Sequence, residues 1–285
     1  MLDDDDDTAQ IAYEDYEFYS EGTVRAAKEA GTNYISTAEA DRLLAEWRQA
    51  ARYEDVSRNS DKIILSLFDE SGVWSGPWVE AGYDVIQVDI QNGVDINDFC
   101  VEFLFDNGID RADGILAACP CTDFAASGAR WWEGKDANGQ TANSVELVNQ
   151  TLRTIELFRP ELFWVIENPV GRIREMTGLP EPHLIFDPSH YGDPYTKKTM
   201  LYGKFNADLP FANVEPTEGS RIHKLSGNSA KGKKLRSETP DGFSNAFFMA
   251  NSFQQQELRL AQTMGATSEK QEYKKQWLTG FGPKG

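Results

Sequence analysis

Short apolar runs, separated by polar turns and longer amphipathic stretches, recur through the middle of the 285-residue chain. They span 63–68, 83–89, 114–118 and 162–166, and they are rich in β-branched and aromatic residues. Runs of this length and composition are typical of buried strands. The stretches between them are long enough for crossover helices, so consecutive strands are expected to be parallel. The pattern predicts an α/β fold with a doubly wound, mostly parallel sheet.

The same pattern predicts what flanks the sheet. Residues 1–60 are expected to form an acidic extension with one helix, which a capping box at Ser36–Glu39 begins. Residues 61–202 then form the main domain, and residues 203–240, interrupted by prolines and glycines, form a small irregular lobe. Residues 241–285 become helical again and are expected to close the main domain.

Composition bears on where the protein works. No apolar run approaches the ~18 residues that a membrane-spanning helix needs, so no membrane association is expected. The chain starts with an acidic stretch rather than the basic and apolar pattern of a secretory signal. Three cysteines, Cys100, Cys119 and Cys121, cannot all pair with one another. A reducing, cytoplasmic setting and a monomer are therefore expected.

The net charge of −18 argues against simple nucleic-acid binding, because phosphates require a positive surface. The charge is unevenly distributed, however. Between Tyr195 and Arg236 there are nine lysines and arginines against three acids. This segment is either a local cationic face or a solvated loop, and charge alone leaves both interpretations open.

Cys121 is the first candidate for chemistry. It lies on a polar loop just beyond the third apolar run, where open α/β sheets present catalytic groups at their carboxyl edge. A thiolate in such a place can act as a nucleophile. Cys119, closer to the strand, is expected to be buried and inert. The cysteines and three histidines show no metal-binding spacing, so no metal site is expected.

Acidic residues follow the other predicted strands. Glu167 follows a very apolar run, where burial raises a carboxyl pKa and favours a protonated, hydrogen-bond-donating form. Pairing of Glu167 with Arg172 or Arg174 is the structural alternative. Asp89 either accepts hydrogen bonds from ribose hydroxyls or only caps its strand. The turn at Leu67–Gly72 lacks the glycine-rich dinucleotide fingerprint, and its acids suit a cationic ligand better than a pyrophosphate.

Five segments resemble, in order and spacing, the motifs of DNA cytosine-5 methyltransferases: Ser66–Gly72, Val88–Ile90, Val94–Asp98, Ala118–Gly128 and Glu167–Gly171. The resemblance covers roughly residues 62–171. It implies a Rossmann-like methyltransferase that transfers a methyl group from S-adenosylmethionine to C5 of cytosine in DNA. It also implies that Cys121 is the nucleophile that bonds to C6 of the ring and that Glu167 binds the cytosine.

The resemblance assigns further roles. Residues 61–202 become a catalytic and cofactor-binding domain, and residues 203–240 become a short target-recognition region. The implied S-adenosylmethionine contacts are Phe68, Asp69, Glu70, Ser71, Gly72, Asp89, Ile90, Asp95, Ile96, Pro120 and Asn251. Because a cytosine inside a duplex is inaccessible, the base must be flipped out while basic residues hold the backbone. The expected nucleic-acid contacts are Lys197, Arg221, Lys224, Lys231, Lys233, Lys234 and Arg236.

The chain also departs from that family. Tyr195–Thr199 stands where the family has Gln-x-Arg-x-Arg, so Lys197 can keep only a point charge there. Thr122 replaces the usual Gln after the nucleophile. The short lobe resembles that of bacteriophage-encoded members, which would place the protein in host cytoplasm. Two alternatives remain: the same chemistry on RNA or a free pyrimidine nucleotide, or a non-catalytic S-adenosylmethionine- or DNA-binding relative.

Overall fold

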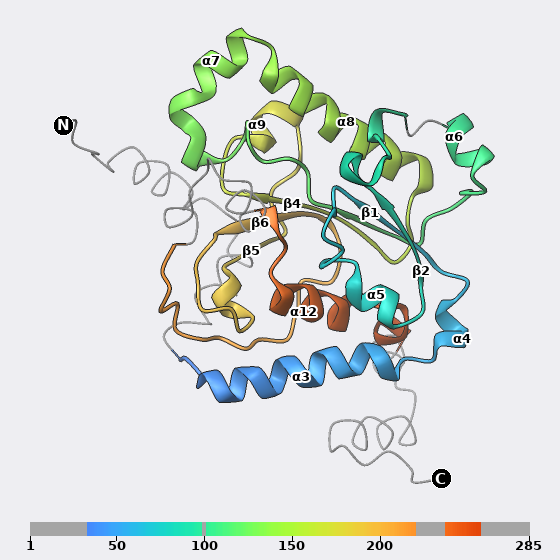
Figure 1. Ribbon diagram of the computed structural model, residues 1–285, viewed down its shortest axis with the longest axis vertical. Helices are drawn as coiled ribbons and strands as arrows, with labels where there is room; N and C mark the ends of the chain where they lie inside the picture. Colours follow the sequence, from blue (N-terminus) through green and yellow to red (C-terminus); the bar gives the residue numbers. More distant parts are fainter. Residues whose placement is uncertain (1–32, 99–100, 221–236, 258–285) are drawn as a thin grey trace, which may run out of the picture.

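A six-stranded sheet runs through the centre of the computed structural model, which describes residues 33–98, 101–220 and 237–257 (Figure 1). The strand order is β2-β1-β3-β4-β6-β5. The bounds are β1 Ile63–Leu67, β2 Asp84–Val88, β3 Gly114–Ala117, β4 Phe163–Pro169, β5 Leu184–Phe186 and β6 Thr199–Lys204. The pairs among β2, β1, β3 and β4 are parallel, whereas β6 runs antiparallel to both β4 and β5. The predicted α/β fold with a mostly parallel sheet is confirmed.

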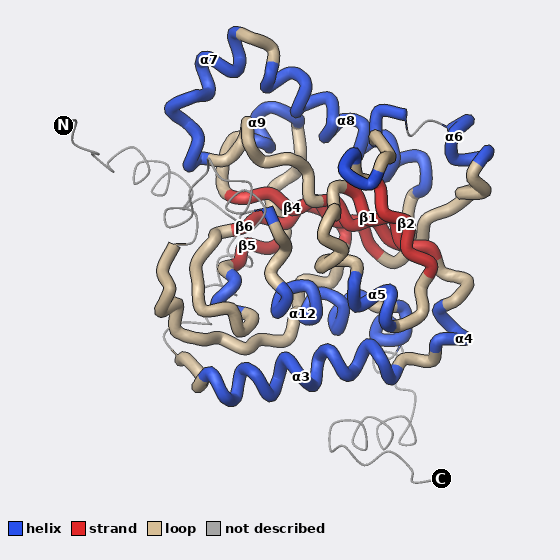
Figure 2. Tube along the Cα trace, viewed as in Figure 1, coloured by secondary structure: helices blue, strands red, loops and turns tan. Residues whose placement is uncertain are grey.

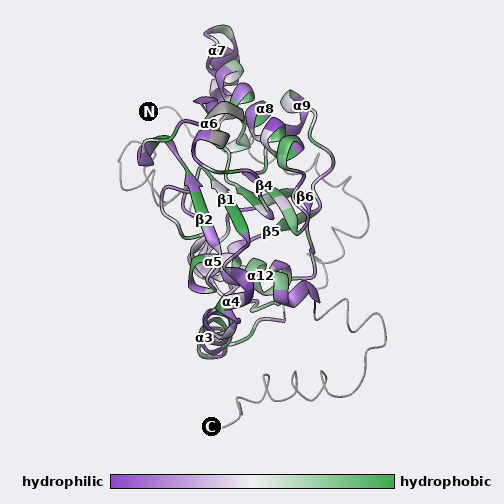
Figure 3. Ribbon diagram, turned by 90° about the vertical axis from the view of Figure 1, so that its right-hand side faces the viewer, coloured by the Kyte–Doolittle hydropathy of each residue, from purple (hydrophilic) through white to green (hydrophobic). Residues whose placement is uncertain are grey.

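Helices cover both faces of this sheet (Figure 2). One face packs against α3 (Thr37–Tyr53), α5 (Gly76–Glu80) and α12 (Asp241–Asn251), with the short α4 (Val56–Asn59) between α3 and β1. Over the other face lie α6 (Val101–Asp106), α7 (Trp132–Ala137), α8 (Gln140–Phe158) and α9 (Ile173–Thr177). Neighbouring strand residues point to opposite faces: Ile64 joins the first apolar core and Leu65 the second. Figure 3 shows the apolar strands between more polar helices.

The predicted helix after Ser36 is part of the core. Ser36 caps α3 by accepting a hydrogen bond from the backbone N–H of Glu39 at 3.2 Å. Leu44 and Trp47 of this helix are buried together with Phe243 and Phe247 of α12. The helix therefore completes one layer of the fold, although it precedes the first strand.

Two features of the sheet differ from the expectation. The segment Tyr195–Thr199, matched by resemblance to a strand, only leads into one, because β6 begins at Thr199. Pairing with β6 also extends β4 to Pro169, so Glu167 lies inside a strand rather than after its end. Prolines interrupt the apolar pattern between residues 178 and 216, so the sequence did not predict the antiparallel strands β5 and β6.

The start of the predicted irregular lobe packs on the main core. Phe205, Leu209, Ala212 and Val214 are buried against the face that α3 and α12 cover. The basic residues 221–236 lie outside the described residues, as does most of the predicted C-terminal helical region.

No helix in the described part of the chain is long and apolar enough to cross a membrane.

The strand order determines where a ligand can enter. Because β2 and β3 lie on opposite sides of β1, the connections at the carboxyl ends of these strands diverge. Such a reversal leaves a crevice at the carboxyl edge of an open α/β sheet.

Candidate functional site

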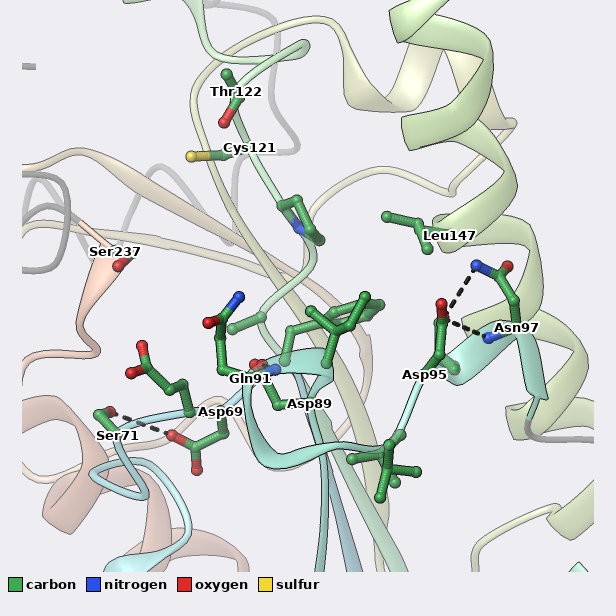
Figure 4. Close-up of a pocket in the computed structure, with 18 of the residues that line it drawn as sticks. Asp69, Ser71, Asp89, Gln91, Asp95, Asn97, Cys121, Thr122, Leu147 and Ser237 are labelled. Atoms are coloured by element: carbon green, nitrogen blue, oxygen red, sulfur yellow. Dashed lines mark hydrogen bonds between the residues drawn. The ribbon is translucent and has the colours of Figure 1, made fainter. Parts of the chain in front are cut away.

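A cavity of about 630 Å³ occupies this crevice, at the carboxyl ends of β1, β2 and β3. Its volume is within the range of roughly 300–1,000 Å³ that is usual for small-molecule sites. Figure 4 shows Cys121 and Thr122 above the loop that carries Asp89 and Gln91. The cavity therefore brings Cys121 together with the ends of the first two strands.

The turn after β1 forms one wall and has an unusual backbone. Phe68 has a φ of 61°, in the left-handed region that residues with a side chain rarely adopt. Its N–H donates to Val88 O at 2.8 Å, which bonds the turn to the end of β2. A residue keeps such a backbone conformation only where the surrounding structure holds it in place. Residues of this kind are common at functional sites.

Asp69 holds this turn from within. Its buried carboxylate accepts hydrogen bonds from Ser66 Oγ at 2.9 Å and from the N–H and Oγ of Ser75 at 3.0 and 2.8 Å. Asp69 lines the cavity, but its carboxylate serves mainly to shape the turn. Gly72, predicted as a ligand contact, is not among the lining residues.

The loop after β2 forms the second wall. Asp89 Oδ1 accepts from Gln91 N at 2.8 Å and so caps the 3-10 turn η1 (Ile90–Asn92). The Ile90 side chain is 66% exposed even though it lines the cavity, which leaves an apolar surface open to a ligand. Asp95 caps the following turn η2 (Ile96–Asp98) by accepting from the N–H and the Nδ2 of Asn97.

The remaining wall comes from segments that the sequence analysis did not assign. Asn143, Glu146 and Leu147 of α8 line the cavity, as do residues 237–239 just before α12. Residues 143, 146 and 147 are spaced so that they share one face of a helix, and this spacing could have indicated that they line a common surface. Residues 237–239 carried no such signal.

The lining residues give the cavity a negative charge. Six of them are acidic and none is a lysine or arginine within the described residues: Asp69, Glu70, Asp89, Asp95, Glu146 and Glu238. A wall of this sign repels phosphate groups and attracts a cationic ligand. The glycine-poor turn led to the same expectation from the sequence.

Cys121 and Cys119 have different surroundings. Cys121 is partly exposed at the cavity, and its carbonyl accepts from the N–H groups of Phe124 and Ala125 at 3.0 and 2.9 Å. Cys119 is buried, and burial raises the pKa of its thiol to about 12. Within the described residues neither cysteine forms a disulfide. The predicted burial of Cys119 is confirmed.

Glu167 is buried in β4 with 8% of its surface exposed. Burial raises the pKa of its carboxyl, and the charge of Lys197 opposes this shift from a distance of 3.9 Å between Nζ and Oε1. The neighbouring Asn168 donates to Cys119 O at 2.9 Å, which joins this part of β4 to the Cys121 loop. Glu167 does not line the cavity itself.

Neither suggested arginine pairs with Glu167. Arg172 pairs with Asp136, and Arg174 pairs with Glu181. Lys197, predicted as a nucleic-acid contact, is also buried, so its charge faces the Glu167 carboxylate rather than the solvent. The alternative in which Arg172 or Arg174 pairs with Glu167 is therefore wrong.

Asn251 lies away from the cavity. It is fully buried and joins α12 to Asn206 through two hydrogen bonds, at 2.7 and 3.1 Å. Residues 237–239, just before α12, line the cavity, whereas Asn251 is the last residue of this helix, about 15 Å from its start. Asn251 is therefore not among the residues that line this cavity, and its contact with a ligand stays a prediction.

Of the other predicted ligand contacts, eight besides Asp69 do line the cavity: Phe68, Glu70, Ser71, Asp89, Ile90, Asp95, Ile96 and Pro120. Six predicted nucleic-acid contacts lie outside the described residues: Arg221, Lys224, Lys231, Lys233, Lys234 and Arg236. Among the described residues no three His, Cys, Asp or Glu side chains are grouped so that they could hold a metal ion.

The Cys121 loop lies directly on the end of β4. Ala125 and Gly171 form an isolated antiparallel bridge, and Ala126 N donates to Val170 O at 2.8 Å. A Cβ atom on Gly171 would lie 1.9 Å from the carbonyl oxygen of Phe124. Only glycine permits this close approach of the loop.

Comparison with known proteins identifies no relative: neither the scan against protein-family models nor the search of curated proteins finds a match.

Gly171→Ala is expected to displace the Cys121 loop, because the new methyl group would overlap the Phe124 carbonyl. Thermal unfolding should show a loss of about 1–3 kcal/mol, the usual cost of forcing atoms into a packed site. Gly134→Ala is the matched control, since a Cβ there meets no atom within 4 Å and alanine favours the helix. Equal stability of the two variants would contradict the close docking of the loop.

Proposed function

We propose that the protein transfers a methyl group from S-adenosylmethionine to C5 of cytosine in DNA. The observation that carries the proposal is the placement of Cys121. It lies at an acidic small-molecule cavity, and the adjacent strand carries a buried glutamate with a raised pKa. Nucleophile, carboxyl and ligand cavity are the three parts that covalent pyrimidine methylation requires.

The residues of the cavity fit this cofactor. Its sulfonium and ammonium groups outweigh its single carboxylate, so a wall with six acids favours it. The exposed Ile90 side chain offers an apolar face to the adenine ring, and Asp89 lies where an acid can accept hydrogen bonds from ribose hydroxyls. When bound, the cofactor supplies the electrophilic methyl group.

The protein's own groups prepare the cytosine. The Cys121 thiolate adds to C6, the C5–C6 double bond breaks, and N3 takes the proton that the Glu167 carboxyl holds. C5 becomes nucleophilic and takes up the methyl group as the sulfur–methyl bond breaks and the demethylated cofactor leaves as a neutral thioether. A base then removes the C5 proton, its electrons restore the C5–C6 double bond, and the thiolate leaves. N3 returns its proton to the Glu167 carboxylate.

Lys197 has a role in this scheme. Proton transfer to N3 leaves Glu167 as a buried carboxylate, which is costly without a partner. The Lys197 ammonium, 3.9 Å from Oε1, stabilises that carboxylate. A lysine in this position keeps the required charge even though the bidentate geometry of an arginine is absent.

Exposed groups near the Cys121 loop support a nucleic-acid substrate. Trp131 is 60% exposed, and the Arg130 guanidinium lies 5.2 Å from the centre of its ring. Both belong to η3 (Ala126–Trp131), which follows the loop directly. An exposed aromatic ring beside a cation is suited to stacking on an unpaired base and contacting a phosphate. Neither residue stands out from the sequence pattern.

Transfer of labelled methyl from S-adenosylmethionine to duplex DNA tests the proposal. The wild-type protein is expected to label cytosine, and Cys121→Ser should abolish this labelling because serine is a far weaker nucleophile toward C6. Cys119→Ser, the same change at the buried neighbour, should retain it.

Label on RNA or free pyrimidine nucleotides but not on DNA would reassign the acceptor. Binding of the cofactor without transfer to any of the three would indicate a non-catalytic relative. Absence of cofactor binding would contradict the proposal as a whole.

The pH dependence of the same transfer tests Glu167. Because burial raises the pKa of its carboxyl, the rate should fall as pH rises through that pKa and the proton for N3 is lost. Glu167→Gln should lower kcat by about 10²-fold or more, as is typical when a general acid is removed, and should abolish this alkaline decline. Glu181→Gln, on the exposed surface, should leave the profile unchanged. An unaltered decline in Glu167→Gln would assign it to another group.

A further inference from the structure

A buried arginine connects the strand of Glu167 to the loop of Cys121. Arg172 lies between β4 and α9 and is 8% exposed. Its backbone N–H donates to Phe124 O at 2.9 Å, and its Nε donates to Asp123 O at 3.1 Å. Arg172 therefore binds the carbonyl groups of Asp123 and Phe124, the second and third residues after Cys121.

The guanidinium is itself fixed from three directions. Nη1 and Nη2 donate to the two carboxylate oxygens of Asp136, each at 2.7 Å, and Nη2 also donates to Thr141 Oγ1 at 3.1 Å. The Trp132 ring lies 4.5 Å from the centre of the guanidinium. Hydrogen bonds from Arg172 and Thr141 lower the pKa of Asp136 to about 2, so this carboxyl stays ionised across the physiological range.

A second cation, Lys135 of α7, also binds this loop. Lys135 Nζ donates to Thr122 O at 2.6 Å and lies 2.8 Å from Asp123 Oδ1. Asp123 in turn accepts from Ser144 Oγ of α8 at 2.5 Å. The three residues after Cys121 are therefore anchored to Arg172 in the segment after β4, to Lys135 of α7 and to Ser144 of α8.

We infer that Arg172 is the positioning residue that fixes the Cys121 thiol relative to Glu167. Arg172 lies five residues after Glu167 on the same continuous segment, and its side chain reaches the loop that carries Cys121. The planar fork makes several directed bonds at once, which a lysine cannot reproduce. The kinetic part of this inference rests on the proposed function.

The consequence for the reaction follows from geometry. Attack on C6 requires the sulfur to be held close to its productive position, and a displacement of about 1 Å can cost about 10²-fold in rate. Arg172 does not line the cavity, so its loss should leave cofactor binding intact. The effect is therefore expected in kcat and not in the KM for the cofactor.

Arg172→Gln and Arg172→Lys test the inference, with Arg174→Gln as the matched control. Arg174 lies two residues further on, exposed, and pairs only with Glu181 among the described contacts. Both Arg172 variants should lower kcat by about 10²-fold with unchanged KM for S-adenosylmethionine. Arg174→Gln should match the wild-type protein in both constants.

A second measurement does not depend on methyl transfer. Iodoacetamide alkylation, resolved by mass spectrometry, should proceed several-fold faster at Cys121 in Arg172→Gln, because the loosened loop exposes its thiol more often. Cys119 should stay slow in every variant, since it is buried. An unchanged rate at Cys121 in a folded variant overturns the inference, whatever the kinetics show.

The two proposals fail in different ways. No methyl transfer by the wild-type protein, together with faster alkylation in Arg172→Gln, would refute the proposed function and keep the positioning role. If Arg172→Gln does not fold, Arg172→Lys and Asp136→Asn decide by the same alkylation criterion. Asp136→Asn keeps the arginine but weakens the fork that orients it.

Discussion

The pairing of β6 with β4 is the constraint on which the candidate site depends. It extends β4 through Glu167 to Pro169 and buries the carboxyl, which raises its pKa. The same pairing places Lys197, just before β6, within 3.9 Å of that carboxylate. The chain that leaves β4 then supplies Gly171 and Arg172, on which the Cys121 loop rests. A nonlocal strand pair thus determines the surroundings of both proposed reactive groups.

Acidic and basic residues occupy different places around this edge of the sheet. Acids line the cavity, where a cationic cofactor is proposed to bind. Three cations lie outside the cavity lining. Lys135 pairs with Asp123 of the Cys121 loop, Arg172 pairs with Asp136, and Lys197 faces Glu167. The overall charge of −18 therefore describes the site poorly, because the proposed chemistry depends on a few partly or fully buried cations.

The sequence predicted the parts of the fold that depend on local pattern. Four apolar runs marked the parallel strands, and the position of Cys121 after one of them placed it at the carboxyl edge. The antiparallel strands were missed because both lie in a proline-rich stretch, β5 has only three residues, and β6 pairs with the distant β4. Asn251 lies at the far end of α12 from the residues that line the cavity, and the sequence does not tell which end of this helix faces the cavity. Arg172 was considered only as a partner of Glu167, since its contacts with Asp123 and Asp136 appear only in the folded chain.

In the proposed reaction Cys121 forms a covalent bond to C6 of cytosine while C5 accepts a methyl group. A duplex whose target cytosine carries fluorine at C5 tests this directly, because fluorine cannot leave as a cation and the adduct cannot collapse. With S-adenosylmethionine present, we predict a protein–DNA complex that survives denaturation, with the nucleotide attached to Cys121 in the digested protein. Absence of such a complex while the cofactor binds, or attachment at another residue, would contradict the account.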